Sequence, residues 1–141
     1  MILYFLIGFT HSGKTFYREQ QSCTPSVDTS SLLSGIHRGK GAPVLDGTIL
    51  LSLLENVLEA FDNEEALLLE GPFLTRENRV TFTDYMKKRG HSVHYIWIDP
   101  PISLILSRMK DRDAGLKLKQ EVPLFDFPTM EEGAERIHYM I

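Results

Sequence analysis

The chain has 141 residues, 43% of them hydrophobic, and this is enough to bury a continuous core as one domain, residues 1–141. Its formal net charge of −4 argues against a protein that coats nucleic acid non-specifically, because such binding depends on many Lys and Arg contacts to phosphates. The single cysteine, Cys23, excludes an intramolecular disulfide framework and, with no targeting segment recognised, favours a reducing, cytoplasmic setting.

The chain opens with an apolar run, Ile2–Ile7, that is typical of a buried parallel strand and too short to cross a membrane, so we expect no membrane partner. Residues 8–15 then read GFTHSGKT and match the pattern G-x-x-x-x-G-K-[ST]. Residues 14–21 contain no Gly or Pro and suit the start of a helix. Strand, loop and helix in this order are the context of a phosphate-binding loop, so the sequence predicts a nucleoside triphosphate site.

Each position of this loop has a chemical reason. The glycines let successive backbone N–H groups turn toward the phosphates, and the helix that follows offers its positive N-terminus to the same anion. Lys14 is predicted to reach the β- and γ-phosphates, and the Thr15 hydroxyl to bind Mg²⁺. His11 has two interpretations, an outward-facing loop residue or a substrate contact. The predicted nucleotide-binding residues are Gly8, Thr10, His11, Ser12, Gly13, Lys14, Thr15 and Phe16.

The next third of the chain predicts a strand and two helices. A short strand over residues 24–27 ends at Asp28, a helix covers residues 29–38, and residues 35–41 form a basic, glycine-punctuated loop. Asp46 is a candidate N-cap for the second helix. One apolar stripe with the i, i+3, i+4 spacing of a buried helix face comprises Leu50, Leu53, Leu54, Val57, Leu58 and Phe61.

A buried strand over residues 65–70 is closed by Gly71 and Pro72, and Thr75 is expected to cap a helix that runs to Arg89 and stops at Gly90. Residues 92–98 alternate as a further strand.

The last third predicts two helices around a loop. Asp99 is a candidate N-cap, with proline in the first turn, for a helix to about Arg112. Residues 114–128 are polar and punctuated by proline, which predicts a long loop of the kind that forms lids. Thr129 and Glu132 have the spacing of a capping box for a terminal helix. The core face of the first helix is Ile102, Ile105, Leu106 and Met109, and that of the last is Met130, Ala134, Ile137 and Ile141.

This alternation predicts an α/β protein with the three-layer P-loop NTPase fold. We expect a parallel sheet of about four strands, helices on both faces, and a lid before the C-terminal helix. Ligands of such sheets bind at the carboxyl ends of the strands.

The chain resembles the polynucleotide 5′-kinase-like family of P-loop kinases over nearly its whole length. The resemblance is carried by residues 8–15, the acidic strand end at residues 27–28, the segment LEGPFLTRENR at residues 69–79, and residues 99–112. Two short stretches, residues 122–123 and 125–128, also resemble the lid of that family. The resemblance implies an ATP-dependent kinase that requires Mg²⁺.

By this resemblance Asp28 is the general base that accepts the proton of the acceptor hydroxyl. The alternative is that Asp28 caps the helix that follows it. Arg108 and Arg112 lie one helical turn apart, and the resemblance implies that they clamp the transferring phosphoryl group, with Arg112 as the transition-state candidate. The alternative is a solvated, salt-bridged face that involves Asp111 or Asp113.

Glu70 stands where the family keeps an acidic residue that orients Mg²⁺ through water. The family motif has Asp there and Thr two residues later, whereas this chain has Glu70 and Pro72. Capping or pairing with a lysine is the alternative role for Glu70.

The acceptor is the least determined part of the prediction. Two basic surfaces are candidates for contact with DNA or RNA, one that includes Arg76 and Arg79 and one that includes Arg38, and a solvated helix face is the alternative. The family tends to place an arginine three residues after the base, where this chain has Ser31. The acceptor we expect is a hydroxyl of a nucleic acid or nucleotide, either a 5′-hydroxyl end or a hydroxyl on a modified base. A nucleoside or another small molecule is the alternative. A nucleotide-dependent switch or binding module is the alternative from another functional class. The sequence does not distinguish ATP from GTP and does not indicate an oligomeric state.

Overall fold

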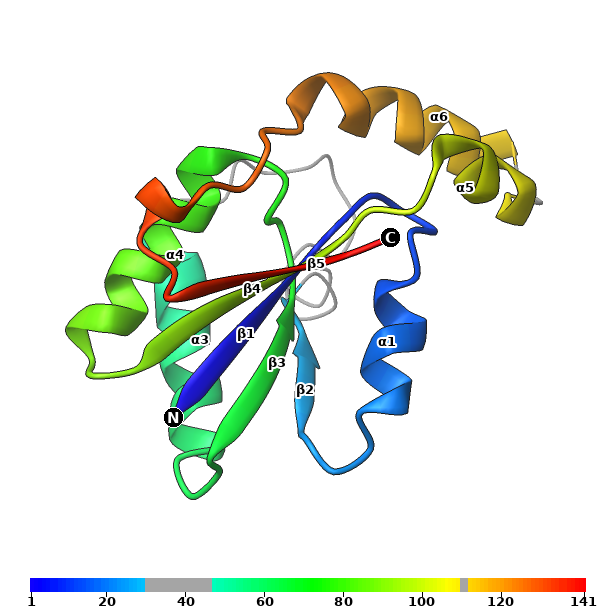
Figure 1. Ribbon diagram of the computed structural model, residues 1–141. Helices are drawn as coiled ribbons and strands as arrows, with labels where there is room; N and C mark the ends of the chain where they lie inside the picture. The colour runs from blue at the N-terminus through cyan, green and yellow to red at the C-terminus, as the bar shows by residue number, and fades with distance from the viewer. Residues whose placement is uncertain (30–46, 110–111) are drawn as a thin grey trace.

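The computed structural model describes residues 1–29, 47–109 and 112–141 (Figure 1). Four predictions therefore lie outside the described residues: most of the helix over residues 29–38, the glycine loop over residues 35–41, the Asp46 cap, and the position of Arg38. The backbone of Arg112 begins a helix, but its side chain is outside the described part, so the predicted role of that side chain stays a prediction.

The described residues form one parallel sheet with the strand order β2-β3-β1-β4-β5. Each strand pairs with its neighbour in parallel register. The predicted parallel α/β architecture is confirmed, with five strands rather than about four. The strands are β1 (Ile2–Ile7), β2 (Ser26–Asp28), β3 (Ala66–Glu70), β4 (Ser92–Ile98) and β5 (Arg136–Met140).

Helices cover the sheet on both faces (Figure 1). α3 (Gly47–Ala60) and α4 (Arg76–Lys88) lie on one face, and α1 (Lys14–Gln20) lies on the other. α5 (Ile102–Arg108) and α6 (Arg112–Glu121) cross above the carboxyl ends of the strands. This arrangement places the segments after β1 and β3, and the end of β2, under α6, at the edge where such sheets bind ligands.

The main core lies between the sheet and the layer of α3 and α4. Side chains from the central strand, such as Leu3 and Phe5, pack there against Leu54 and Leu58 of the predicted α3 stripe. The α4 prediction is also confirmed: the Thr75 hydroxyl accepts from the Asn78 N–H at 3.2 Å, and Gly90 follows the helix with φ +83°. The three central strands, β1, β3 and β4, are largely buried because helices cover both faces of the sheet, whereas the edge strands β2 and β5 are more exposed.

The predicted terminal helix is wrong, and β5 takes its place. The Glu132 carboxylate does accept from the Thr129 N–H at 2.9 Å, but the turn ends after η2 (Met130–Glu132), where Gly133 has φ +105°. Residues 136–140 then alternate and pair with β4. A capping signal and a few inward apolar residues fit one helical turn as well as a whole helix.

The lid predicted as a loop over residues 114–128 is largely helical. α6 covers its first part, η1 (Val122–Leu124) follows, and residues 125–129 are irregular. Residues 116–121 read LKLKQE, all strong helix formers, and the first proline comes only at Pro123, after the helix has ended. A polar composition with proline therefore does not exclude a helix that ends before the first proline.

The Asp99 cap is also wrong. α5 begins after Pro101, and the Asp99 carboxylate instead accepts from the Tyr139 hydroxyl at 2.7 Å. Of its predicted core face Ile105 is buried, whereas Ile102 and Leu106 are 46% and 53% exposed. The helix ends at Arg108, before Arg112.

Within the described ranges no helix has both the length and the apolar character needed to span a bilayer.

Candidate functional site

The phosphate-loop segment connects β1 to α1 in a conformation that requires its glycines. Gly13 has φ +110°, in the left-handed region that side chains disfavour. A Cβ on Gly8 would lie 2.8 Å from the Ile98 carbonyl oxygen, so only glycine fits against the end of β4. The loop closes on itself through the Ser12 N–H, which donates to the Phe9 carbonyl at 3.1 Å. The sequence motif therefore forms the tight turn that its spacing predicts.

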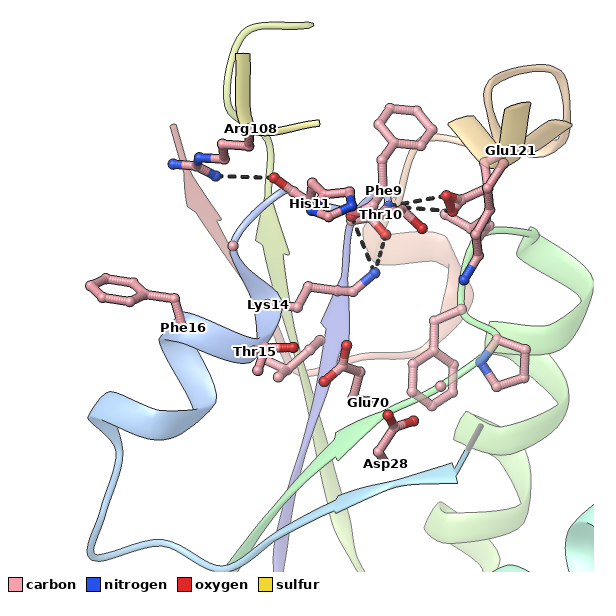
Figure 2. A pocket seen from close by; sticks show the side chains of 18 residues that line it. Phe9, Thr10, His11, Lys14, Thr15, Phe16, Asp28, Glu70, Arg108 and Glu121 are labelled. Carbon is pink, nitrogen blue, oxygen red and sulfur yellow. Dashed lines mark hydrogen bonds between the residues drawn. The ribbon is translucent and has the colours of Figure 1, made fainter. Parts of the chain in front are cut away.

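Lys14 is folded over this loop. Its ammonium donates to the Gly8 carbonyl at 2.6 Å and the Phe9 carbonyl at 3.3 Å (Figure 2). Burial lowers the pKa of Lys14, while the nearby carboxylates of Glu70 and Glu121 raise it. The ammonium is thus a desolvated positive charge whose hydrogen-bond partners are neutral carbonyls, in the field of the carboxylates of Glu70, Glu121 and Asp28, and an anionic ligand would stabilise it further.

A cavity of about 780 Å³ opens beside the loop (Figure 2). It is bounded by the loop, by the ends of β2 and β3, by the segment after β3, and by α5 and α6. The predicted site residues that line it are Gly8, Thr10, His11, Gly13, Lys14, Thr15, Phe16, Asp28, Glu70 and Arg108. Ser12 is not among the lining residues, because its side chain is buried behind the loop.

Two carboxylates enter the cavity from neighbouring strand ends. Asp28 ends β2 and Glu70 ends β3, and the two are register partners in the parallel pair. Figure 2 shows both side chains below Lys14. One Glu70 oxygen lies 3.3 Å from the Arg18 guanidinium of α1, an ion pair without hydrogen-bond geometry. The alternative roles of Asp28 as base or cap stay open, because the helix predicted after it is outside the described residues.

The site suits Mg²⁺ bound together with phosphate oxygens. Thr15 and Glu70 supply the hard oxygen ligands that Mg²⁺ prefers, and one buried Glu70 oxygen has no hydrogen-bond partner among the described residues. In the described part of the chain, no group of three or more His, Cys, Asp or Glu side chains could hold a metal by itself. A metal here would therefore need oxygens of the nucleotide, as Mg²⁺ in nucleotide sites does.

Arg108 reaches the phosphate loop from α5. One of its guanidinium nitrogens donates to the His11 carbonyl at 3.1 Å (Figure 2). His11 itself is exposed with φ +61° and also lines the cavity, so both of its interpretations stay open. Arg108 therefore lies over the loop rather than on a purely solvated face.

Sequence reasoning missed three parts of the site. From α6, Lys117 and Glu121 line the cavity, and the Glu121 carboxylate accepts from the Thr10 N–H at 3.0 Å. Their four-residue spacing on a helix face would have revealed them if this segment had been predicted as a helix. The third part is the wall after β3, where Phe73 stacks on Phe5 with ring centroids 4.5 Å apart.

Arg79, predicted as a substrate contact, is a structural residue. Its side chain has no exposure and forms an ion pair with Glu132 at 2.7 Å. Arg76 is exposed, lies 3.9 Å from Glu131, and is not among the residues that line the cavity. Basic residues count toward a nucleic-acid surface only where their charge reaches solvent, so this correction removes one member of the predicted surface.

The chain shares its α/β fold, with one parallel sheet, with two solved structures. It superposes on the crystal structure of APE1195 with a TM-score of 0.61 and 14% identity, over 97% of this chain and 83% of that one. It also superposes on a gluconokinase from Sinorhizobium meliloti 1021 with a TM-score of 0.61 and 18% identity, over 96% of this chain and 79% of that one.

No family model matches the chain, and no curated protein matches it at a significant level. At these identities the structural likeness establishes the fold alone. Membership of the polynucleotide 5′-kinase-like family is not confirmed.

Proposed function

We propose that this protein is an ATP-dependent, Mg²⁺-requiring phosphotransferase that moves the γ-phosphate to a hydroxyl acceptor. The observation that carries the proposal is the single cavity in which a phosphate loop, Lys14 and Thr15 face the carboxylates of Asp28 and Glu70. Phosphoryl transfer needs positioning and charge neutralisation above all, and these are the groups that supply them.

Within this proposal the loop N–H groups and Lys14 hold the β- and γ-phosphates. Lys14 already lies at the loop with its charge desolvated. Thr15 and Glu70 would hold Mg²⁺, which neutralises phosphate charge. Arg108, whose guanidinium donates to the His11 carbonyl, would add positive charge beside the phosphates, as the predicted clamp requires.

Asp28 completes the chemistry as the acceptor base. The acceptor oxygen forms a bond to the γ-phosphorus while the bond between that phosphorus and the β,γ-bridging oxygen breaks, and ADP leaves. The acceptor proton passes to the Asp28 carboxylate, which lines the cavity at the end of β2. A switch that only hydrolyses nucleotide has no need of this base. The effect of removing the Asp28 carboxylate therefore distinguishes a kinase from a switch.

For the acceptor we propose a small hydroxyl-bearing molecule. The similar fold of a gluconokinase supports this choice, and the burial of Arg79 weakens the expected nucleic-acid surface. Transfer to a polynucleotide 5′-hydroxyl or to a modified base rests on the sequence resemblance, and it is the alternative that the same assay tests.

The test is transfer from γ-labelled ATP to a panel of sugars, polyols, nucleosides, DNA and RNA 5′-ends, and hydroxymethylated DNA. We expect labelled product with a small hydroxyl compound and none with Lys14→Ala, because Lys14 holds the phosphates. Lys88→Ala is the matched control, since Lys88 is exposed on α4 and does not line the cavity. Circular dichroism should show the same fold in all three proteins. Unchanged transfer by Lys14→Ala would refute the assignment of this loop as the active site.

A further inference from the structure

α6 inserts a carboxylate into the phosphate loop. Glu121, the last residue of α6, accepts from the backbone N–H of Thr10 at 3.0 Å through one oxygen and 3.4 Å through the other (Figure 2). The two residues are 111 positions apart in sequence, so the contact joins two separate parts of the fold. The acceptor is a charged side chain, and the donor is a backbone N–H within the phosphate-loop segment, residues 8–15.

The charge of Glu121 also acts on Lys14. Glu121 and Glu70 both raise the pKa of Lys14, against the lowering caused by burial. Glu121 therefore offers the loop what a phosphate offers, a negative oxygen for an N–H and a counter-charge for the ammonium. The Lys14 ammonium meanwhile donates to the carbonyls of Gly8 and Phe9.

We propose that Glu121 is an internal competitor of the nucleotide phosphates, which must displace its carboxylate from Thr10 before the loop can bind them fully. This inference rests on the proposed function, because it assumes that the loop binds a nucleotide. Its consequence is that nucleotide binding is coupled to a shift of α6. Lys117, one turn earlier on the same helix and also lining the cavity, stays available to the incoming anion.

A purely structural anchor makes the opposite prediction. If Glu121 only fastened α6 above the cavity, its removal would loosen a wall of the site and weaken the binding of ligands. If it competes, its removal frees a loop N–H and tightens binding. The sign of the change in affinity therefore separates the two roles.

The experiment compares the parent chain, Glu121→Gln, Glu121→Asp and the control Glu59→Gln, which neutralises an exposed carboxylate on α3. Calorimetry measures the binding of ATP–Mg²⁺ and of pyrophosphate–Mg²⁺. We expect Glu121→Gln to bind both about tenfold more tightly, the size of one charge-assisted hydrogen bond. Glu121→Asp keeps the charge on a shorter side chain and should show a smaller gain, and the control should bind like the parent.

A second measurement needs no nucleotide. The Thr10 amide should exchange its hydrogen more slowly in the free parent than in free Glu121→Gln, because the charged carboxylate is a stronger acceptor for this N–H than the amide oxygen of glutamine. Tighter binding together with this loss of protection supports the competition.

If the parent binds ATP in a manner that depends on Lys14, and Glu121→Gln binds equally or more weakly, the competition is overturned and the proposed function stands. If neither the parent nor Glu121→Gln binds ATP or pyrophosphate, the proposed function fails and the competition fails with it.

Discussion

Two polar regions of this protein are buried in different ways. On one side of the sheet, the Arg79 guanidinium has an acceptor for every nitrogen: both oxygens of Glu132 and the carbonyls of Phe73, Leu74 and Asp126, at 2.7 to 3.2 Å. We refer to Arg79 and these partners as the Arg79 cluster. It ties α4 to η2 and to the segment that follows α6. Its polar groups are fully used within the fold.

The phosphate loop is the contrasting region. Ser12 is 3% exposed and its hydroxyl has no hydrogen-bond partner among the described residues, while one oxygen of Glu70 has only the ion pair with Arg18. Lys14 carries a buried charge whose hydrogen-bond partners are neutral carbonyls. Buried polar groups are normally hydrogen-bonded, and leaving one unpaired costs free energy. The Arg79 cluster therefore stabilises the fold, whereas the loop keeps hydrogen-bonding capacity for a ligand.

The largest effect should come from Asp28→Asn, on the loop side of the comparison. If Asp28 is the base, the amide keeps the volume and the capping ability of Asp but accepts no proton, so turnover should fall by on the order of 10² to 10⁴. The urea midpoint should change little. Kinase rates under single-turnover conditions, together with urea denaturation, measure both effects.

Asp28→Ala provides the control for this experiment. If Asp28 is only a cap, Asn should substitute almost freely, and Ala should cost about 1 kcal/mol of stability with turnover nearly preserved. Near-normal turnover in Asp28→Asn would show that Asp28 is not the base and would favour the nucleotide-dependent switch.

The next largest effect is on the Arg79 cluster. Arg79→Ala leaves the Glu132 carboxylate buried without its cation, which should lower the free energy of unfolding by about 3 to 5 kcal/mol. The double variant Arg79→Met/Glu132→Leu removes both charges and should lose much less. Urea denaturation of the parent, the single and the double variant gives the comparison. Equal losses in the single and double variants would show that packing, rather than the uncompensated charge, is what matters.

The sequence predicted the parts of the fold that depend on local patterns. The α3 stripe, the Thr75 cap and the apolar strands β1 and β3 all carry their signal within a few residues. The prediction for the β5 segment was wrong for two reasons. The strand forms by pairing with β4, which is distant in sequence, and Glu132 has the spacing of a helix capping box although its carboxylate also forms the ion pair with Arg79. Patterns along the chain do not report such long-range pairing.

The candidate site divides in the same way. The phosphate loop was readable because backbone geometry dictates its spacing, and the strand ends at Asp28 and Glu70 followed from the parallel sheet. Lys117 and Glu121 were missed because their approach to the loop depends on where α6 crosses the sheet. Arg79 was misassigned because charge alone does not reveal that a partner 53 residues away buries it.

The smallest effect is also the most direct test of the comparison, and it uses one hydroxyl from each region. On the Arg79 side, the Thr83 hydroxyl pairs with the Tyr95 hydroxyl at 2.8 Å, and both residues are fully buried. Thr83→Val keeps the shape and leaves Tyr95 without this partner, so it should cost about 1 kcal/mol of stability. Ser12→Ala removes a hydroxyl that has no partner among the described residues, so stability should hold or rise slightly. The urea midpoints of the free proteins measure these two effects.

The same variants are then compared with saturating ATP–Mg²⁺. If the ligand uses the Ser12 hydroxyl, the ligand should raise the urea midpoint of Ser12→Ala less than that of the parent, and it should raise the midpoint of Thr83→Val as much as that of the parent. A loss of about 1 kcal/mol in free Ser12→Ala would show that the hydroxyl is already satisfied, and the contrast between the two regions would then rest on Lys14 and Glu70 alone.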